Sequence, residues 1–220
     1  MDESTQDVDY DKADDPTQVL YCESNEKLSP KILMIGAHSG SLWAYKTDKD
    51  GDLELDLYDT SATPKDGRNL AGGMDAYVWS KDGLIFAAPH APGQLHHSSF
   101  TSGNKVKCAG FIGVKQGKVV SANNDSGHYL PPPAYLRDFV SFLHKQDVLD
   151  PKAEFELKLQ TGPLRGLSYQ ELLNWKPVKP EKPLDRRIAG TAVIGGHVMT
   201  LRPPTPLKPP LPANLPWKKN

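Results

Sequence analysis

The sequence has few cysteines, no long apolar run and no excess of charge of either sign, and each absence excludes a class of protein. Two cysteines in 220 residues are too few for a disulfide scaffold, so two reduced thiols are expected, with a single bridge as the alternative. No apolar run approaches the ~18 residues that a membrane helix needs, so no membrane span is predicted. With 26 Lys+Arg against 27 Asp+Glu, the composition excludes a generally basic nucleic-acid binder.

Motifs of the common nucleotide-binding and hydrolytic enzymes are missing as well. No GxGxxG, P-loop, HExxH or GxSxG element occurs, so none of the standard sites is available. The alternating acids from Asp48 to Glu54 could ligate calcium through their oxygens, but the sixth and twelfth positions do not fit an EF-hand loop. A polar hairpin turn explains these acids more simply. No CxxC or HxxxH spacing supports zinc, and no metal site is predicted.

The two ends of the chain differ in composition from its middle. Residues 1–19 carry seven acids and one lysine, which predicts a flexible acidic tail because such a segment buries little apolar surface. Ten of the 20 prolines lie between Pro177 and Pro216. Residues 201–220 are basic and proline-rich, which predicts an extended polyproline segment, either solvated or wrapped around its own domain. A single folded domain is therefore expected at 20–200.

The middle of the chain is dominated by strand signals. Two strands are predicted at 31–46 and 53–59, and AYVWSKDGLIFAAP and VKCAGFIGVKQGKVVSANND each predict a further hairpin. Paired turn residues of the kind that close tight hairpins separate the strands. These pairs are Asp50-Gly51, Asp82-Gly83 and Gln116-Gly117.

The strand predicted at 53–59 has a regular pattern. Leu53, Leu55 and Leu57 alternate with Glu54, Asp56 and Tyr58. Because side chains alternate between the faces of a strand, this pattern predicts that the leucines form one buried face.

Helical spacing replaces strand alternation after the proline run at 131–133. Apolar residues recur at helical intervals from Tyr135 to Leu143, and prolines are favoured at a helix start. The strand AEFELKLQ follows, then the short helix SYQELLNW with Ser168 and Glu171 as a capping box. RIAGTAVIGGHVMTL is a candidate last strand whose glycines could mark a bulge. This order predicts an α+β fold with a largely antiparallel sheet built from hairpins and a few short helices.

The segment QLHHSSFTSG, residues 94–103, combines imidazoles and hydroxyls. On a strand, His96 and His97 would point to opposite faces, so one of them could face a pocket. A nucleophilic Ser–His pair is one interpretation, although neighbours on a strand rarely reach hydrogen-bond geometry. A polar segment that donates hydrogen bonds to a ligand is the other.

The segment NNDSGHYLPPP, residues 123–133, is rich in turn-forming residues. His128 and Tyr129 follow the turn, and three prolines stiffen its exit. These side chains either recognise a ligand or cap neighbouring backbone groups. We expect this segment and the one around Ser98 to line a single cleft, because the hairpin between them brings them together.

Residues 76–143 resemble a known module. The resemblance rests on HHSSF, an Ala-Gly strand, SGHYLP and a helix rich in Phe and Leu, and it covers about 68 of the 220 residues. The module occurs in plant IQ-motif calmodulin-binding proteins and in many bacterial and fungal proteins, toxins among them. It is also similar to the bacterial effector family that ADP-ribosylates a threonine of ubiquitin. No IQ motif is present here, so calmodulin binding is not carried over.

The similarity to the transferase family implies a split-β, ADP-ribosyltransferase-like fold with NAD bound as the substrate. The reaction would break the bond from nicotinamide to ribose and transfer ADP-ribose to a host protein, with ubiquitin as one candidate acceptor. A nearby carboxylate would stabilise the positive charge that develops. Since no Sec signal is visible, such an effector or toxin would be delivered into a host cell by a specialised secretion route. A cytoplasmic protein is the alternative.

The resemblance also assigns roles to individual residues. The catalytic roles fall on His97, His128 and Tyr129. Outside the matching blocks, Arg68 carries a guanidinium that suits a pyrophosphate. The other residues expected to bind NAD are His96, Ser98, Ser99, Phe100, Ser126 and Gly127.

One position departs from the bacterial pattern. Many bacterial members carry Glu directly after the Ala-Gly pair, whereas this chain has Phe111, and the plant members lack that Glu too. The replacement carboxylates are Asp75, Asp125, Glu154 and Glu156. Three interpretations stay open at this point: a transferase, a non-catalytic protein-binding module of the same fold, and an unrelated β-rich structural or immunity protein. The sequence does not define the oligomeric state.

Overall fold

The structure is a computed structural model, and it describes most of the predicted domain. The described residues are 32–48, 50, 52–65, 72–91, 95–101, 104–159, 161–176, 191–194 and 197–200. Three predictions lie outside these residues: the acidic tail at 1–19, the proline-rich segment at 201–220 and the pyrophosphate role of Arg68.

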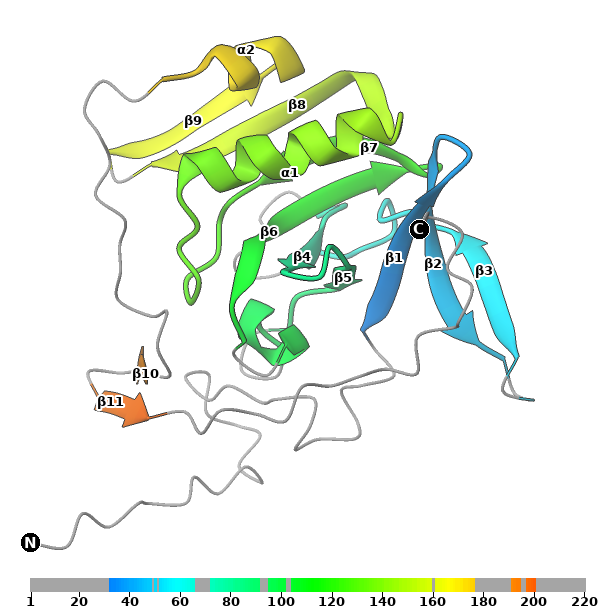
Figure 1. The fold of residues 1–220 in the computed structure, drawn as a ribbon, viewed down its shortest axis with the longest axis horizontal. Helices are drawn as coiled ribbons and strands as arrows, with labels where there is room; N and C mark the ends of the chain where they lie inside the picture. Colours follow the sequence, from blue (N-terminus) through cyan, green and yellow to red (C-terminus); the bar gives the residue numbers. More distant parts are fainter. Residues whose placement is uncertain are drawn as a thin grey trace, which may run out of the picture.

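Among the described residues, nine strands form one sheet in the order β3-β2-β1-β5-β4-β6-β7-β8-β9, and two helices pack against it (Figure 1). Neighbouring strands are antiparallel except β7 and β8, which are parallel and are joined through α1, as parallel neighbours require a crossover. The strands are β1 (Leu33–His38), β2 (Ser41–Thr47), β3 (Leu53–Leu57), β4 (Asp75–Ser80), β5 (Ile85–Ala88), β6 (Val106–Lys115), β7 (Lys118–Asn123), β8 (Leu149–Leu159) and β9 (Gly162–Leu167). The remaining elements are the 3-10 helix η2 (His97–Thr101), α1 (Pro133–Lys145), α2 (Tyr169–Asn174) and the hairpin of β10 (Thr191–Ile194) and β11 (His197–Thr200).

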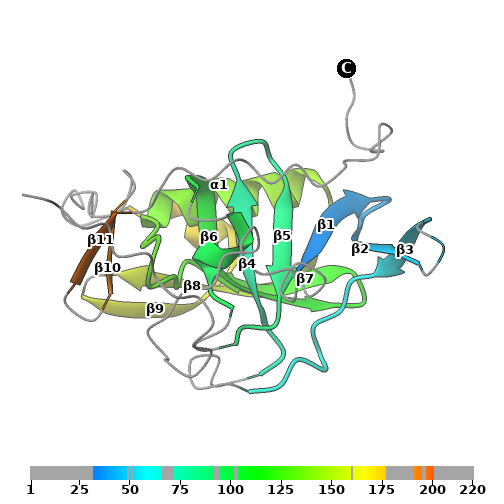
Figure 2. The same cartoon turned by 90° about the horizontal axis from the view of Figure 1, so that it is seen from below.

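The mostly antiparallel α+β architecture is therefore confirmed. Seen from below, β3 and β9 lie at opposite sides of the sheet (Figure 2). No helix in the described part of the chain is long and apolar enough to cross a membrane. The similarity to an ADP-ribosyltransferase fold is not confirmed.

The predicted turns between β4 and β5 and between β6 and β7 are confirmed. The segment 31–46, however, is a hairpin and not one strand, because Ser39 and Gly40 adopt φ of 51° and 73° and turn the chain between β1 and β2. The last predicted strand likewise divides into β10 and β11. Strand β9 was not predicted, because its sequence GPLRGL carries residues that are depleted in strands.

The sheet is buried on both faces at β4 and β6, and this fixes where a site can form. On one face α1 covers the larger core, in which Phe139 stacks on Tyr77 with ring centroids 4.4 Å apart. On the other face Val78 and Phe111 belong to a smaller core, together with Phe100 of η2. Residues that alternate along β4 and β6 therefore serve opposite faces, and the smaller core lies on the side that carries the HHSSF segment.

The predicted buried face of β3 is wrong. Leu53, Leu55 and Leu57 are 51%, 41% and 38% exposed. The strand is the last in the sheet, and α1 packs against β6 and β8. Alternation correctly places the three leucines on one face of β3, but the sequence does not state whether another element covers that face.

The predicted capping box of α2 is confirmed and carries a testable consequence. Ser168 Oγ accepts a hydrogen bond from Glu171 N at 3.3 Å, and Glu171 Oε2 accepts one from Ser168 N at 2.8 Å. We expect Ser168→Ala to lower the free energy of unfolding by ~1 kcal/mol in urea titrations, since an N-cap is lost. Ser141→Ala, inside α1, is the control and should be neutral or stabilising, because alanine favours a helix interior. Equal losses in the two variants would contradict this role of Ser168.

Candidate functional site

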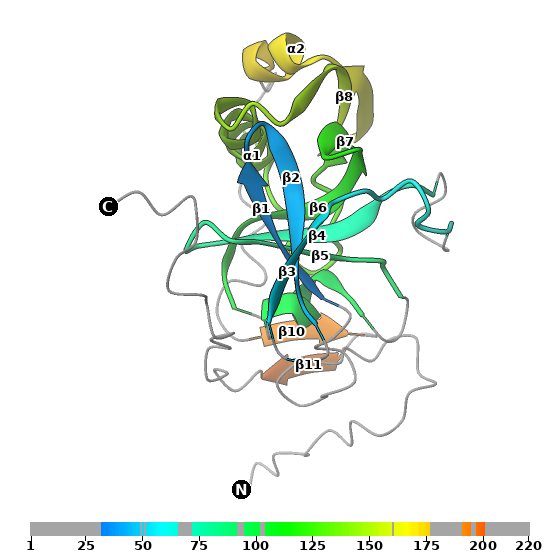
Figure 3. The same cartoon turned by 90° about the vertical axis from the view of Figure 1, so that its right-hand side faces the viewer.

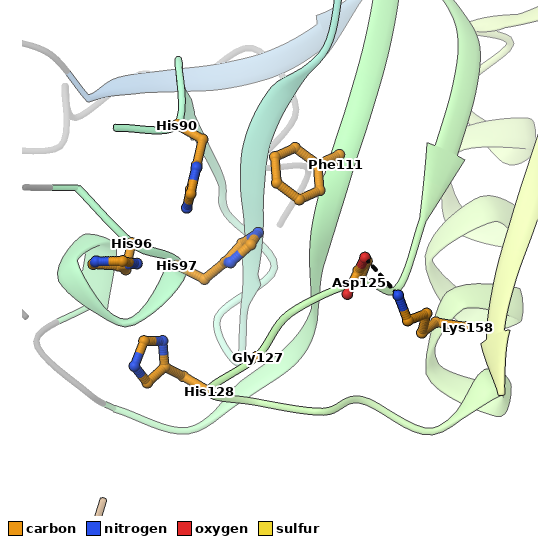
Figure 4. A pocket seen from close by; sticks show the side chains of 8 residues that line it. All are labelled: His90, His96, His97, Phe111, Asp125, Gly127, His128 and Lys158. Carbon is orange, nitrogen blue, oxygen red and sulfur yellow. Dashed lines mark hydrogen bonds and ion pairs between the residues drawn. The ribbon is translucent and has the colours of Figure 1, made fainter. Parts of the chain in front are cut away.

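A pocket of about 280 Å³ lies where the HHSSF and SGHY segments meet. Its walls are formed by the loop after β5, the start of η2, strand β6, the loop between β7 and α1, and strand β8 (Figure 4). The residues that line it are His90, His96, His97, Phe111, Asp125, Gly127, His128 and Lys158. The structure therefore confirms that the two segments line one cleft.

Four imidazole rings converge in this pocket from three separate segments, as Figure 4 shows. The ring of His96 lies edge-on to His90 and to His128, with centroids 5.5 Å and 5.3 Å apart. The ring of His97 lies 6.1 Å from that of His90. His90, His96 and His97 are each less than one-tenth exposed, so these rings are a built part of the interior and not a surface cluster.

His97 has the most strongly determined environment of the four. Its Nε2 lies 2.8 Å from the carbonyl oxygen of Gly110, which can only accept, so Nε2 carries the proton and Nδ1 is left as an acceptor. Burial lowers the pKa of His97 from 6.5 to about 3; the bond to Gly110 opposes this shift, and the neighbouring histidines add to it. His97 is therefore neutral at physiological pH.

Gly110 makes this arrangement possible because β6 and the end of β7 approach closely there. A Cβ at Gly110 would lie 2.1 Å from the carbonyl oxygen of Asn123. The side-chain Oδ1 of Asn123 accepts hydrogen bonds from the backbone N–H groups of Phe111 at 2.9 Å and Asp125 at 3.0 Å. The Ala-Gly pair of the family pattern thus has a packing role here, since it holds the SGHY loop against β6.

The other residues of the HHSSF block lie in or behind the pocket wall. Ser99 Oγ accepts a hydrogen bond from His96 N at 3.1 Å, and Phe100 belongs to the smaller core. Ser98 Oγ is buried and has no hydrogen-bond partner among the described residues. None of these three residues belongs to the pocket lining.

Two residues of the SGHY block hold the loop in place. Ser126 Oγ accepts a hydrogen bond from Tyr129 N at 3.3 Å. The hydroxyl of Tyr129 lies 2.8 Å from Thr101 Oγ1 and donates to Asn104 O at 2.8 Å. Of the predicted site residues that the structure describes, His96, His97, Gly127 and His128 line the pocket, and Ser98, Ser99, Phe100, Ser126 and Tyr129 lie outside its lining.

Only one of the four candidate carboxylates lines the pocket. Asp125 does so, and Lys158 Nζ lies 3.0 Å from its Oδ2. Asp75 lies elsewhere, where its oxygens accept hydrogen bonds from Tyr58 and Thr63 and burial raises its pKa. Glu156 pairs with Arg165, and Glu154 is exposed on β8.

The position after the Ala-Gly pair brings an aromatic ring into the pocket. Phe111 lies edge-on to His97 and to His90, with ring centroids 5.3 Å and 5.5 Å apart. The wall at this point is therefore apolar. Among the described residues, no three His, Cys, Asp or Glu side chains are arranged to hold a metal ion.

Two lining residues were not predicted. His90 lies in APHAP, where a single histidine between prolines gives no functional signal, and Lys158 is one of the polar positions of a regular strand. Their place in the pocket depends on the pairing of β8 with β7 and on the path of the loop after β5, which local sequence does not define.

Comparisons with known proteins place the similarity in one part of the chain. Residues 61–135 match the family described as the IQ motif-containing protein middle domain, and this range contains every pocket residue except Lys158. The chain is 33% identical over 72 residues to IQ domain-containing protein IQM2 of Arabidopsis thaliana, and 35% identical over 72 residues to IQ domain-containing protein IQM5 of the same plant. Each alignment covers 33% of this chain, but only 12% and 14% of the respective relative, so the chain spans about an eighth of the length of these proteins. No solved structure matches.

These matches correct part of the functional prediction. The predicted ADP-ribosyltransferase, toxin and effector identity is wrong, because the matching family is the IQ motif-containing protein middle domain and the relatives found are IQ domain-containing proteins of a plant. The predicted resemblance to plant IQ-motif proteins is supported. The matches give no support to a host acceptor such as ubiquitin.

Proposed function

We propose that the protein is a non-catalytic protein-binding module, and that the histidine-lined pocket receives an uncharged polar side chain of its partner. The observation that carries this proposal is the place of Phe111. Where the transferase pattern has a carboxylate, the pocket has an apolar ring in contact with His97. The carboxylate that does line the pocket, Asp125, is paired with Lys158.

The chemistry of the pocket favours an uncharged guest. The charges of Asp125 and Lys158 compensate each other, and His97 is neutral at physiological pH because its pKa lies at about 3. A charged side chain would lose its hydration here without a free counter-charge, whereas an amide or hydroxyl can form a hydrogen bond with the neutral imidazole of His97. A volume of about 280 Å³ lies just below the roughly 300–1,000 Å³ of sites for drug-sized ligands, which suits a single side chain.

A peptide-display selection tests this proposal. Random peptides would be selected on the immobilised full chain, and the Kd of the enriched peptides would be measured by fluorescence anisotropy. We expect these peptides to share an Asn, Gln, Ser or Thr, and we expect His128→Ala to raise their Kd at least tenfold. His128 is the choice because it is partly exposed and lines the pocket.

His38→Ala is the matched control, because His38 is an exposed histidine on β1 and lies outside the pocket lining. It should leave the Kd unchanged. Peptides that bind His128→Ala as tightly as the parent protein, or that require a charged residue, would refute the proposal.

NAD is a second candidate ligand for the same pocket, carried by the resemblance of the HHSSF and SGHY blocks. A dinucleotide would extend beyond a volume of about 280 Å³. Calorimetric titration of NAD into the parent protein and His128→Ala separates the candidates. Saturable heat that the substitution abolishes would support NAD, and the absence of heat would exclude it.

A further inference from the structure

The edge strand β3 presents an apolar face that the pocket does not explain. Leu53, Leu55 and Leu57 are 38–51% exposed on one face of β3, and four strands of the sheet separate β3 from β6. In Figure 3, which shows the right-hand side of Figure 1, β1, β2 and β3 lie in front of the rest of the sheet.

The backbone of β3 is also oriented for pairing. Tyr58 N donates to Leu42 O at 3.0 Å, and Asp48 N donates to Asp52 O at 2.9 Å. In an antiparallel ladder, hydrogen-bonded pairs alternate with pairs that are not hydrogen-bonded, so Glu54 and Asp56 form the intervening hydrogen-bonded pairs with β2. The N–H and C=O groups of the three leucines therefore point away from β2, toward the edge that carries no further strand among the described residues.

The two edge strands of the sheet differ in how well they are protected against pairing with a further strand. Natural edge strands are commonly blocked by proline, lysine or irregular geometry. Strand β9, at the opposite edge, has the sequence GPLRGL with Pro163, Arg165 and two glycines at positive φ. Strand β3 has the sequence LELDL, with no proline, lysine or glycine and with only acidic charges, so of these two edges it is the one better able to accept another strand, provided that the strand is basic.

Charge restricts what can pair with β3. From Lys46 to Leu57 the sequence has five acids against two lysines, a net charge of −3. In a second copy paired antiparallel about Leu55, Glu54 would lie opposite Asp56 on both sides of the axis, and such like-charge pairs are destabilising. A second copy of this chain is therefore disfavoured at this edge.

The ends of this chain are also poor candidates by their composition. Residues 1–19 carry seven acids and one lysine, so their charge matches that of β3. Residues 202–220 contain seven prolines, which lack the N–H groups that a new strand must donate. We therefore consider a strand that comes from another protein.

We propose that the β3 edge is a docking site for an extended segment of a partner protein with basic residues at alternate positions, which adds to the sheet as a further antiparallel strand. Apolar residues of this segment would lie opposite the three leucines and exchange backbone hydrogen bonds with them, as in other cases of strand addition. Lysine or arginine would lie opposite Glu54 and Asp56. This surface is independent of the pocket, so its test can fail without affecting the proposed function.

The proposal can be tested with a peptide that is methylated either on one set of backbone nitrogens or on the alternate set. The probe is a fluorescein-labelled peptide with the core Val-Lys-Val-Lys-Val, titrated into the full chain at 150 mM salt with anisotropy detection. In the proposed pairing the valine N–H groups face β3 and the lysine N–H groups face solvent. We expect methylation of the valine nitrogens to raise the Kd at least tenfold and methylation of the lysine nitrogens to raise it less than threefold.

A pair of protein variants locates the binding site. Leu55→Ser should raise the Kd at least tenfold, whereas Leu164→Ser, which removes a leucine of similar exposure on β9, should leave it unchanged. Circular dichroism would show that both variants are folded. No binding by the parent protein, equal effects of the two methylated peptides, equal effects of the two variants, or a homodimer that Leu55→Ser dissociates would each overturn the proposal.

Discussion

We expect Gly110→Ala to lower the free energy of unfolding by at least ~3 kcal/mol, or to prevent folding. A Cβ at this position would lie 2.1 Å and 2.8 Å from the carbonyl oxygen and carbon of Asn123. Both are backbone atoms of Asn123, so relief requires β6 and the end of β7 to separate. Such overpacking typically costs ~1–3 kcal/mol and occasionally more. Here the displacement would also disturb the bond from His97 Nε2 to Gly110 O.

Gly83→Ala provides the control for this prediction. Gly83 lies in the turn between β4 and β5 with φ of 85°, and an added Cβ would meet no atom within 4 Å. Gly83→Ala should therefore lower the free energy of unfolding only by the ~1–2 kcal/mol that the left-handed conformation costs a residue other than glycine. Urea unfolding of both variants makes the comparison. If Gly110→Ala is no less stable than Gly83→Ala, the close approach of β6 to Asn123 does not constrain the site as inferred.

The elements that could be predicted are those specified by local chemistry. The turns at Asp82-Gly83 and Gln116-Gly117, helix α1 and the Ser168 capping box depend on residues within a few positions of one another. The hairpin at Ser39 and Gly40 was missed because apolar residues continue on both sides of it. The burial of Leu55 was predicted wrongly for a different reason: alternation gives the face of a strand, whereas burial depends on whether another element covers that face.

The candidate site was predicted only in part, for a related reason. His97 and His128 could be assigned to one cleft because they flank a hairpin that brings them together. His90 and Lys158 enter the pocket through β5 and β8, whose position depends on the order of strands across the whole sheet. The hydroxyls of Ser99, Ser126 and Tyr129 form hydrogen bonds with other groups of the protein. A hydroxyl next to a histidine in sequence does not show which of them faces the ligand.

We expect the burial of His97 to make the protein less stable in acid. The folded pKa of His97, about 3, lies below the 6.5 of the free side chain, so the unfolded chain binds more protons between these values. Stability is therefore complete above pH ~6.5 and is lost as the pH falls toward 3. Because one pKa unit corresponds to ~1.4 kcal/mol, we expect roughly 2–3 kcal/mol of this contribution to disappear between pH 6 and pH 4.

His97→Gln isolates this contribution, because an amide N–H can still donate to Gly110 O but does not titrate. Urea titrations from pH 7 to pH 4 should give a less steep loss of unfolding free energy for the variant than for the parent protein. Other groups contribute to the acid slope in both proteins, among them Asp59, whose pKa its hydrogen bonds lower to about 2, so the difference between the two slopes is the informative quantity. Identical slopes would mean that His97 is not held neutral in the folded state. The tautomer assigned to it, and with it the uncharged character of the pocket, would then be incorrect.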